Sequence, residues 1–276
     1  MRKSIDFLKA HPLITGVIGA AVGVGATKVF IMDAIWKWAL LRVILTMALS
    51  MFVYLVSKER PFENCHSTTG YILKWGLVTQ ITSVLAFGSL IHSFITGELH
   101  IAAGWFPRLL AAICLAVFVG LFEELVFRVL INDALLYSFR NSKHIIVWIA
   151  VISSLVFGIV HVIGGGIPDS PAAFGAAVFK TVSCAVDGFI LLLLYWKTRN
   201  IWGIALTHAL WDLATFVQSA LTESTTSFGG AKNYTGAGVA GIVIYSFQII
   251  IGLIALAIVW KKVGKTIDFE EIRQNW

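Results

Sequence analysis

Residues 122–128 have the sequence FEELVFR and lie inside an apolar stretch that extends from residue 108 to residue 137. A transmembrane helix needs about 20 mostly apolar residues, so this stretch is long enough to cross a bilayer. A charged side chain at the bilayer centre costs about 2.5–3.5 kcal/mol on insertion scales. Two glutamates and an arginine are therefore expected to be paired, to face the interior of a helix bundle, or to take part in chemistry.

The composition indicates a membrane protein with several spans. Of the 276 residues, 58% are hydrophobic and 13% are charged, whereas soluble domains carry about 25% charged residues. The net charge of +6 would suggest nucleic-acid binding in a soluble protein. Here the basic residues lie between apolar segments, so we expect no nucleic-acid partner. The three cysteines are dispersed and predict neither a disulfide framework nor a zinc finger.

Eight apolar stretches are long enough to cross a bilayer. They are residues 13–32, 34–56, 71–96, 108–137, 145–163, 173–196, 201–219 and 238–260. The first two are separated by little more than Asp33. No soluble domain fits between the stretches. We therefore predict an all-α, multi-pass protein of about eight transmembrane helices. Residues 1–276 would form a single membrane-embedded domain around an intramembrane catalytic cavity.

Basic residues occupy alternate connections between these stretches. They lie at the N-terminus, after the second, fourth and sixth stretches, and in the C-terminal tail: Arg2, Lys3, Lys9, Lys58, Arg60, Arg140, Lys143, Lys197, Arg199, Lys261, Lys262, Lys265 and Arg273. The positive-inside rule then places both termini in the cytoplasm. Because no retention signal is present, we expect the protein in the cell membrane.

The two glutamates are predicted to differ in role. Successive helical residues point about 100° apart, so Glu123 and Glu124 cannot face the same direction. Arg128 follows Glu124 by four residues and shares its face. This spacing predicts a Glu124–Arg128 ion pair, which leaves Glu123 free to face a cavity. The alternative is a buried pair that only fixes helix packing.

Two later stretches supply histidines. Phe157 and His161 are four residues apart, as are His208 and Asp212. A carboxylate beside an imidazole fixes its tautomer and raises its basicity. The alternatives are a single histidine bonded to a neighbouring helix and a self-contained His208–Asp212 packing pair.

Counting residues from the nearest basic loop gives an estimate of depth. Glu123 and His161 are each about 17–18 residues from such a loop, which places both at roughly 25 Å with a rise of 1.5 Å per residue. His208 is about eight residues from its loop, or roughly 12 Å deep. The estimate leaves open whether His208 reaches Glu123.

One carboxylate and two imidazoles on three spans are suited to hydrolysis. A carboxylate can act as a general base on water. Imidazoles can bind a divalent metal or donate to an oxyanion. The sequence has no GxSxG or HExxH motif.

Three motifs in order resemble those of the type II CAAX prenyl endopeptidase and bacteriocin-immunity family, the CPBP or Abi intramembrane proteases. They are EExxxR at residues 123–128, FxxxH at 157–161 and HxxxD at 208–212, all within residues 108–219. The family commonly ends its third motif in asparagine, where this chain has Asp212.

The resemblance implies an intramembrane endopeptidase in which Glu123 activates the water. His161 would assist it or bind a metal, and His208 with Asp212 would stabilise the oxyanion or complete a metal site. Glu124 would belong to the same catalytic set and, with Arg128, would hold the helix in place.

Two mechanisms and two classes of substrate fit this resemblance. The mechanism could use a divalent metal such as zinc on Glu123, His161 and His208, or a glutamate without metal. The substrate would be a peptide or a lipid-anchored protein that enters from membrane lipid or from the cytoplasm.

Other intramembrane polar residues leave two further interpretations. An ion-coupled transporter could use Lys180 and Asp187, although their spacing of seven residues first predicts a buried structural pair or two snorkelling groups. Such carriers usually show repeated halves, which the sequence does not. The second interpretation is an inactive protein of the same fold that serves as a membrane scaffold or immunity factor. Arg42 in the second stretch is expected to face other helices, and the Gly19–Gly23 pair predicts close helix approach.

Overall fold

The structure is a bundle of helices, with no strand in the residues that it describes. It is a computed structural model. It describes residues 2–30, 32–57, 61–62, 68–76, 81–142, 145–163, 168–222 and 238–274. The all-α prediction is confirmed for this part of the chain.

The helices follow one another along the chain with short connections. The longer ones are α2 (Pro12–Val29), α3 (Ile35–Val56), α5 (Ile81–Ile95), α6 (Trp105–Glu124), α8 (Ile145–Val160), α9 (Pro171–Thr198), α10 (Ile201–Thr222) and α11 (Gly238–Lys262). The shorter ones are α1 (Arg2–Ala10), α4 (Thr69–Gly76), the π-helix η2 (Leu125–Asp133), α7 (Ala134–Ser138), the 3₁₀-helix η5 (Gly264–Thr266) and α12 (Phe269–Ile272).

The prediction of eight spans is not confirmed. Five helical segments in the described residues are long and apolar enough to cross a membrane: Pro12–Val29, Ile35–Val56, Trp105–Ser138, Pro171–Thr198 and Gly238–Thr266. Helix α8 is apolar but has 16 residues. The predicted span at 71–96 is divided between α4 and α5, and residues 77–80 lie outside the described part. Hydropathy registers an apolar stretch but not the residue at which a helix ends.

The outer surface of the bundle is strongly apolar. On α3, Ile44, Met47 and Met51 are 55–66% exposed. On α11, Phe247 and Ile250 are 51% and 58% exposed. A soluble monomer rarely exposes a large contiguous apolar patch. Lipid chains would cover these side chains at no hydrophobic cost, which supports a membrane protein.

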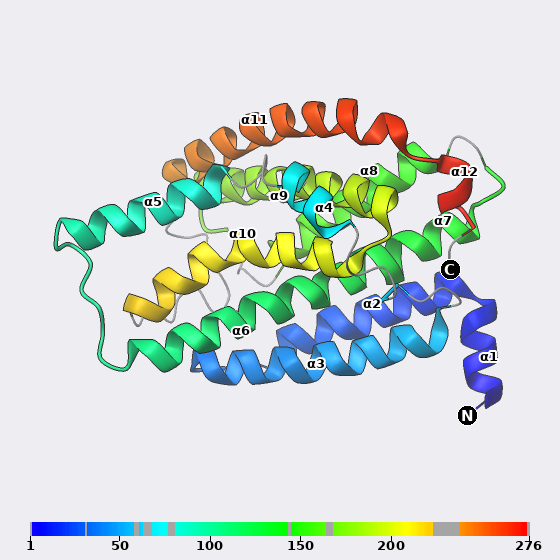
Figure 1. The fold of residues 1–276 in the computed structure, drawn as a ribbon, viewed down its shortest axis with the longest axis horizontal. Coiled ribbons are helices and arrows are strands. Elements are labelled where there is room, and N and C mark those ends of the chain that lie inside the picture. The colour runs from blue at the N-terminus through cyan, green and yellow to red at the C-terminus, as the bar shows by residue number, and fades with distance from the viewer. Residues whose placement is uncertain are drawn as a thin grey trace.

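Helix α6 is the centre of the arrangement, because both α3 and α10 pack along it, while α9 packs against α8 and α11. Figure 1 shows the long helices running along the longest axis of the molecule, with α2 and α3 on one side of α6 and α10 on the other. Both chain ends lie at the same end of the bundle, beside α1, α7 and α12 (Figure 1). This placement agrees with termini on one side of a membrane.

The connection between α2 and α3 contains a surface ion pair. Asp33 accepts a charge-assisted contact from Lys37, with 2.7 Å between Oδ1 and Nζ. The hydrogen bond from Lys37 holds the pKa of the Asp33 carboxyl below its usual range, because it favours the charged form. Both side chains are exposed enough that water screens the pair.

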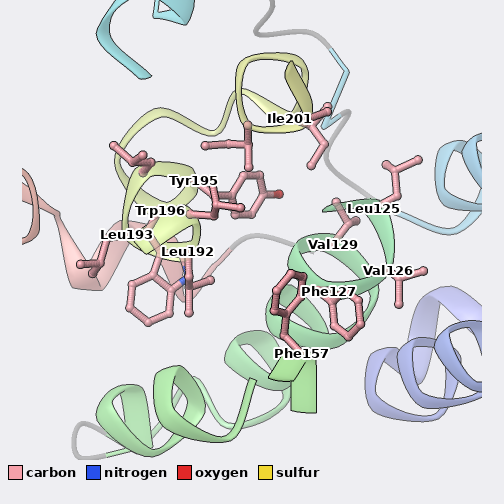
Figure 2. Packing of buried hydrophobic residues seen from close by; sticks show 14 of the residues in the cluster. Leu125, Val126, Phe127, Val129, Phe157, Leu192, Leu193, Tyr195, Trp196 and Ile201 are labelled. Atoms are coloured by element: carbon pink, nitrogen blue, oxygen red, sulfur yellow. The ribbon is translucent and has the colours of Figure 1, made fainter. Parts of the chain in front are cut away.

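A buried core joins η2 to the C-terminal half of α9. Figure 2 shows Leu125 and Val129 of η2 on one side of this core, with Leu192 and Tyr195 of α9 on the other. Phe127 meets the Phe157 ring of α8 edge-on, with 4.9 Å between ring centres. The core therefore holds the residues that follow the two glutamates in a fixed position.

A polar cluster fixes the end of η2. Asp133 accepts a hydrogen bond from the Tyr195 hydroxyl at 2.8 Å and two from the Arg199 guanidinium at 2.8 and 2.7 Å. Arg199 ends α9 with a positive φ of 50°. A buried carboxylate is costly unless it is paired, so these contacts tie η2 to the end of α9.

Glycines allow the closest helix contacts. A Cβ on Gly19 would lie 2.9 Å from the Phe52 ring of α3, so the close approach predicted from the GxxxG pair is present there. A Cβ on Gly120 of α6 would lie 2.5 Å from the Ala205 carbonyl oxygen of α10. Residue 120 must therefore lack a side chain for α10 to pack at its present distance.

We expect Gly120→Ala to destabilise the fold by about 1–3 kcal/mol, because overpacking a tight contact forces the backbone to move. Gly25→Ala is the matched control, since a Cβ there meets nothing within 4 Å. Unfolding of the purified protein in mixed micelles would measure both variants. Equal stability of the two variants would contradict the packing described for α6 and α10.

Candidate active site

The helix that carries the two glutamates changes its winding directly after them. Helix α6 ends at Glu124, and Leu125–Asp133 continues as a π-helix. π-Helical segments are rare in proteins, and those that occur often lie at functional sites. Nothing in the apolar sequence predicts this change of winding.

Glu124 is completely buried and has two charged or polar partners. Its Oε2 lies 2.6 Å from Nε of Arg128, and both side chains are 0% exposed. This is the ion pair predicted from the spacing of four residues. Its Oε1 lies 2.7 Å from Nδ1 of His208 on α10. Glu124 therefore joins the π-helix to α10, a connection that the sequence analysis missed.

The bond to Glu124 determines how His208 is oriented. A carboxylate only accepts, so Nδ1 of His208 carries the proton and donates it. The other ring nitrogen, Nε2, then faces Glu123, with 3.7 Å to Oε2. This arrangement of carboxylate, imidazole and reactive group is the usual way to fix a histidine tautomer.

His161 is oriented in the same way by a backbone group. It lies just after the end of α8, and its Nδ1 donates to the Phe157 carbonyl oxygen at 2.7 Å. Its Nε2 lies 3.4 Å from Oε2 of Glu123. The ring of Phe157 packs against both imidazoles, with centre distances of 4.5 Å to His161 and 5.8 Å to His208.

Glu123 is the point at which the three motifs meet. Its Oε2 is buried and no hydrogen bond reaches it within the described structure, although two imidazole nitrogens lie at 3.4 and 3.7 Å. Its side chain is 17% exposed. The carboxylate therefore has an accessible position and an unused acceptor, as a base or ligand requires.

Comparison with known families agrees with these motifs. Residues 104–214 match the family described as type II CAAX prenyl endopeptidase Rce1-like, and the matched segment contains all three motifs. This segment is similar to the Rce1-like family. The resemblance seen in the sequence is thus confirmed, and the family is one of intramembrane CAAX-type proteases. No curated protein and no solved structure matches the chain at a significant level.

Asp212 of the Rce1-like segment lies at the edge of the site. Its Oδ2 is 3.7 Å from Nε2 of His208, and its side chain is 32% exposed. Nε2 of His208 is therefore equally far from the carboxylates of Glu123 and Asp212. The sequence predicts the His208–Asp212 proximity from their spacing, but not that the imidazole faces two further glutamates.

The depth of His208 no longer conflicts with that of Glu123. A π-helix fits more residues into each turn, so nine residues of η2 advance less along the axis than nine α-helical residues. This shortening accounts for only part of the difference between the two depth estimates, because α8 is α-helical and still brings His161 to Glu123.

The Rce1-like site also has the donor set of a metal centre. One ligand atom from each of Glu123, His161 and His208 lies within 4.8 Å of the others. Both imidazoles donate from Nδ1, so their neutral forms direct lone pairs at the Glu123 carboxylate. Two imidazoles and a carboxylate are among the ligands of catalytic zinc. The residues therefore fit a divalent ion.

Of the two alternatives for Lys180 and Asp187, the described structure does not contain the ion pair. Nζ of Lys180 lies 5.6 Å from the centre of the Tyr245 ring, and Asp187 faces Gly252. Both side chains therefore face α11 instead of each other.

Three of the basic residues used to predict the orientation in the membrane, Lys58, Arg60 and Lys143, fall outside the described residues.

Proposed function

We propose that the protein is an intramembrane endopeptidase that hydrolyses a peptide bond with water activated by Glu123. The observation that carries this proposal is the unused, buried Oε2 of Glu123 between two oriented imidazoles. The match of residues 104–214 to the Rce1-like family supports the same reaction. The substrate would be a peptide or lipid-anchored protein at the cell membrane, and both termini of the enzyme would face the cytoplasm.

The reaction follows from the acceptors that face the cavity. A water molecule between Glu123 and His161 would donate to Oε2 and to Nε2, which directs its lone pairs away from both. Glu123 removes one proton as the water oxygen bonds to the carbonyl carbon. Protonated His208, with Glu124 on its Nδ1 and Asp212 near its Nε2, donates a hydrogen bond from Nε2 to the carbonyl oxygen. Collapse of the tetrahedral species breaks the C–N bond, and the amine leaves with the proton from Glu123.

Glu124 and Arg128 act on this reaction indirectly. Glu124 holds the orientation of the His208 ring through Nδ1, and Arg128 balances the charge of Glu124. A bound divalent ion such as zinc would be held by Glu123, His161 and His208, and would lower the pKa of a water ligand. Metal analysis of purified wild type and His161→Ala distinguishes the two versions. If the wild type contains zinc, and His161→Ala loses both the zinc and the activity, the result supports a metal mechanism. If the wild type is fully active without bound metal, the result supports a mechanism that uses the glutamate alone.

The test is cleavage of a membrane-anchored reporter peptide by the purified protein, with the cut position read by mass spectrometry. We expect His161→Ala to lower kcat by about 10²–10⁴-fold, the usual contribution of a positioned acid–base group. His92→Ala is the control, because His92 is exposed on α5. Solute uptake into proteoliposomes without peptide cleavage would instead indicate a carrier. A folded protein with neither activity would indicate an inactive scaffold.

A further inference from the structure

Arg42 of α3 is held against the site by a contact one turn away. The buried Thr46 hydroxyl shares its one proton between the Arg42 carbonyl oxygen of its own helix, at 2.7 Å, and the Phe118 carbonyl oxygen of α6, at 3.1 Å, and the second contact links α3 to α6 at this level. One turn earlier on α3 and one turn later on α6, Cζ of Arg42 lies 5.1 Å from the centre of the Phe122 ring. Phe122 directly precedes Glu123, and the charge of the guanidinium interacts with the Glu123 carboxylate.

The guanidinium has charged neighbours but no ion-pair partner. Its charge interacts with the carboxylates of Glu123 on α6 and Asp212 on α10. Among the described residues, no carboxylate lies within ion-pair distance of it, and no hydrogen bond reaches its side chain. An intramembrane arginine usually faces an interior or a cavity and has a partner. The five donors of Arg42 are therefore available to a ligand in the region near both acids.

The proposed reaction needs donors in that region. As water adds to the carbonyl carbon, the carbonyl oxygen becomes negative and must be stabilised by donors already in place. Asp212 as a carboxylate accepts hydrogen bonds and repels a second negative charge. Nε2 of His208 is shared between two carboxylates. A guanidinium close to both acids supplies the missing donor and the opposite charge.

We propose that Arg42 is a further catalytic residue, which donates to the scissile carbonyl oxygen as that oxygen gains negative charge. The inference rests on the proposed peptidase function. Arg42 stays protonated throughout, because the proton of the water passes to Glu123 and then to the leaving amine. When the tetrahedral species collapses, the electron pair of the oxyanion re-forms the C=O bond and the contact with Arg42 weakens.

The first test measures kcat and KM separately for reporter cleavage. We expect Arg42→Gln to lower kcat by about 10²–10³-fold, as removal of an oxyanion donor does, with little change in KM. Arg42→Lys should recover part of the loss, because it keeps the charge. Lys37→Gln removes the same charge from the same helix at the exposed Asp33 pair and should leave kcat unchanged.

The second test uses the coupling between Arg42 and Asp212. In an Asp212→Asn background, the amide can donate and no longer repels the oxyanion. We expect the loss caused by Arg42→Gln to be about tenfold smaller in that background, because residues that act on one group are not additive. Equal losses in both backgrounds would contradict a shared oxyanion.

The third test does not depend on turnover. A peptide phosphonate is tetrahedral and anionic where the scissile carbonyl would lie, and Arg42→Gln should remove most of its binding advantage over the uncleaved peptide. Two results would overturn the role of Arg42 and leave the peptidase function intact, provided that the wild type cleaves peptide. One is an unchanged kcat in folded Arg42→Gln, and the other is an unchanged affinity of that variant for the phosphonate. A folded wild type that neither cleaves nor binds peptide would overturn the peptidase function itself, and this inference with it.

Discussion

Glu123→Gln is expected to abolish peptide cleavage while the protein stays folded. An amide has almost the same shape as the carboxylate but cannot take a proton from water. The loss should be at least about 10²–10⁴-fold in kcat, the range for a general base. Stability should change little, because the ion-pair contacts of Glu123 in the described part of the chain are the long ones to His161 and His208, at 3.4 and 3.7 Å.

The adjacent glutamate provides the sharpest comparison. Glu124→Gln makes the same chemical change one residue away, yet it removes a carboxylate that contacts Arg128 and His208. We therefore expect Glu124→Gln to lower stability as well as activity. Glu98→Gln, at an exposed position, is the control for the substitution itself. Full cleavage by a folded Glu123→Gln variant would show that another group is the base.

The different effects on stability expected for these two neighbouring residues could be derived in part from sequence. The helical angle separates Glu123 from Glu124, and the spacing to Arg128 decides which of them is paired. Both arguments are local, and the structure contains the pair they predict. The fold class follows in the same way, because an apolar composition without soluble loops allows little other than membrane helices.

The remaining features depend on contacts between distant segments. His208 meets Glu124 across 84 positions of the chain, and no spacing rule applies at that separation. The sequence of the π-helix after Glu124 contains no local signal for its change of winding, and residue counting did not place His208 at the depth of Glu123. Arg42 was recognisable as a costly charge, but only the register of α3 on α6 shows which site it faces.

Arg128→Met is expected to have the largest effect on stability. The Arg128 guanidinium and the Glu124 carboxylate are both 0% exposed and 2.6 Å apart. Removal of one partner leaves a buried charge without compensation, which typically costs about 3–5 kcal/mol. His208 would keep its bond to Glu124 but cannot replace the planar contact of the guanidinium. Arg128 also packs over the Phe157 ring, with 5.2 Å from Cζ to the ring centre, so methionine should retain part of the apolar contact.

A double variant separates charge from packing. Glu124→Gln combined with Arg128→Met removes both charges, and we expect it to be more stable than Arg128→Met alone, because no unpaired charge stays buried. Lys37→Met is the matched single control, since its pair with Asp33 is exposed to water and should contribute little. Unfolding in mixed micelles measures the stability of the wild type and of the three variants. If the double variant is no more stable than Arg128→Met, packing of the arginine against Phe157 and the core, rather than its charge, holds the glutamate helix in place.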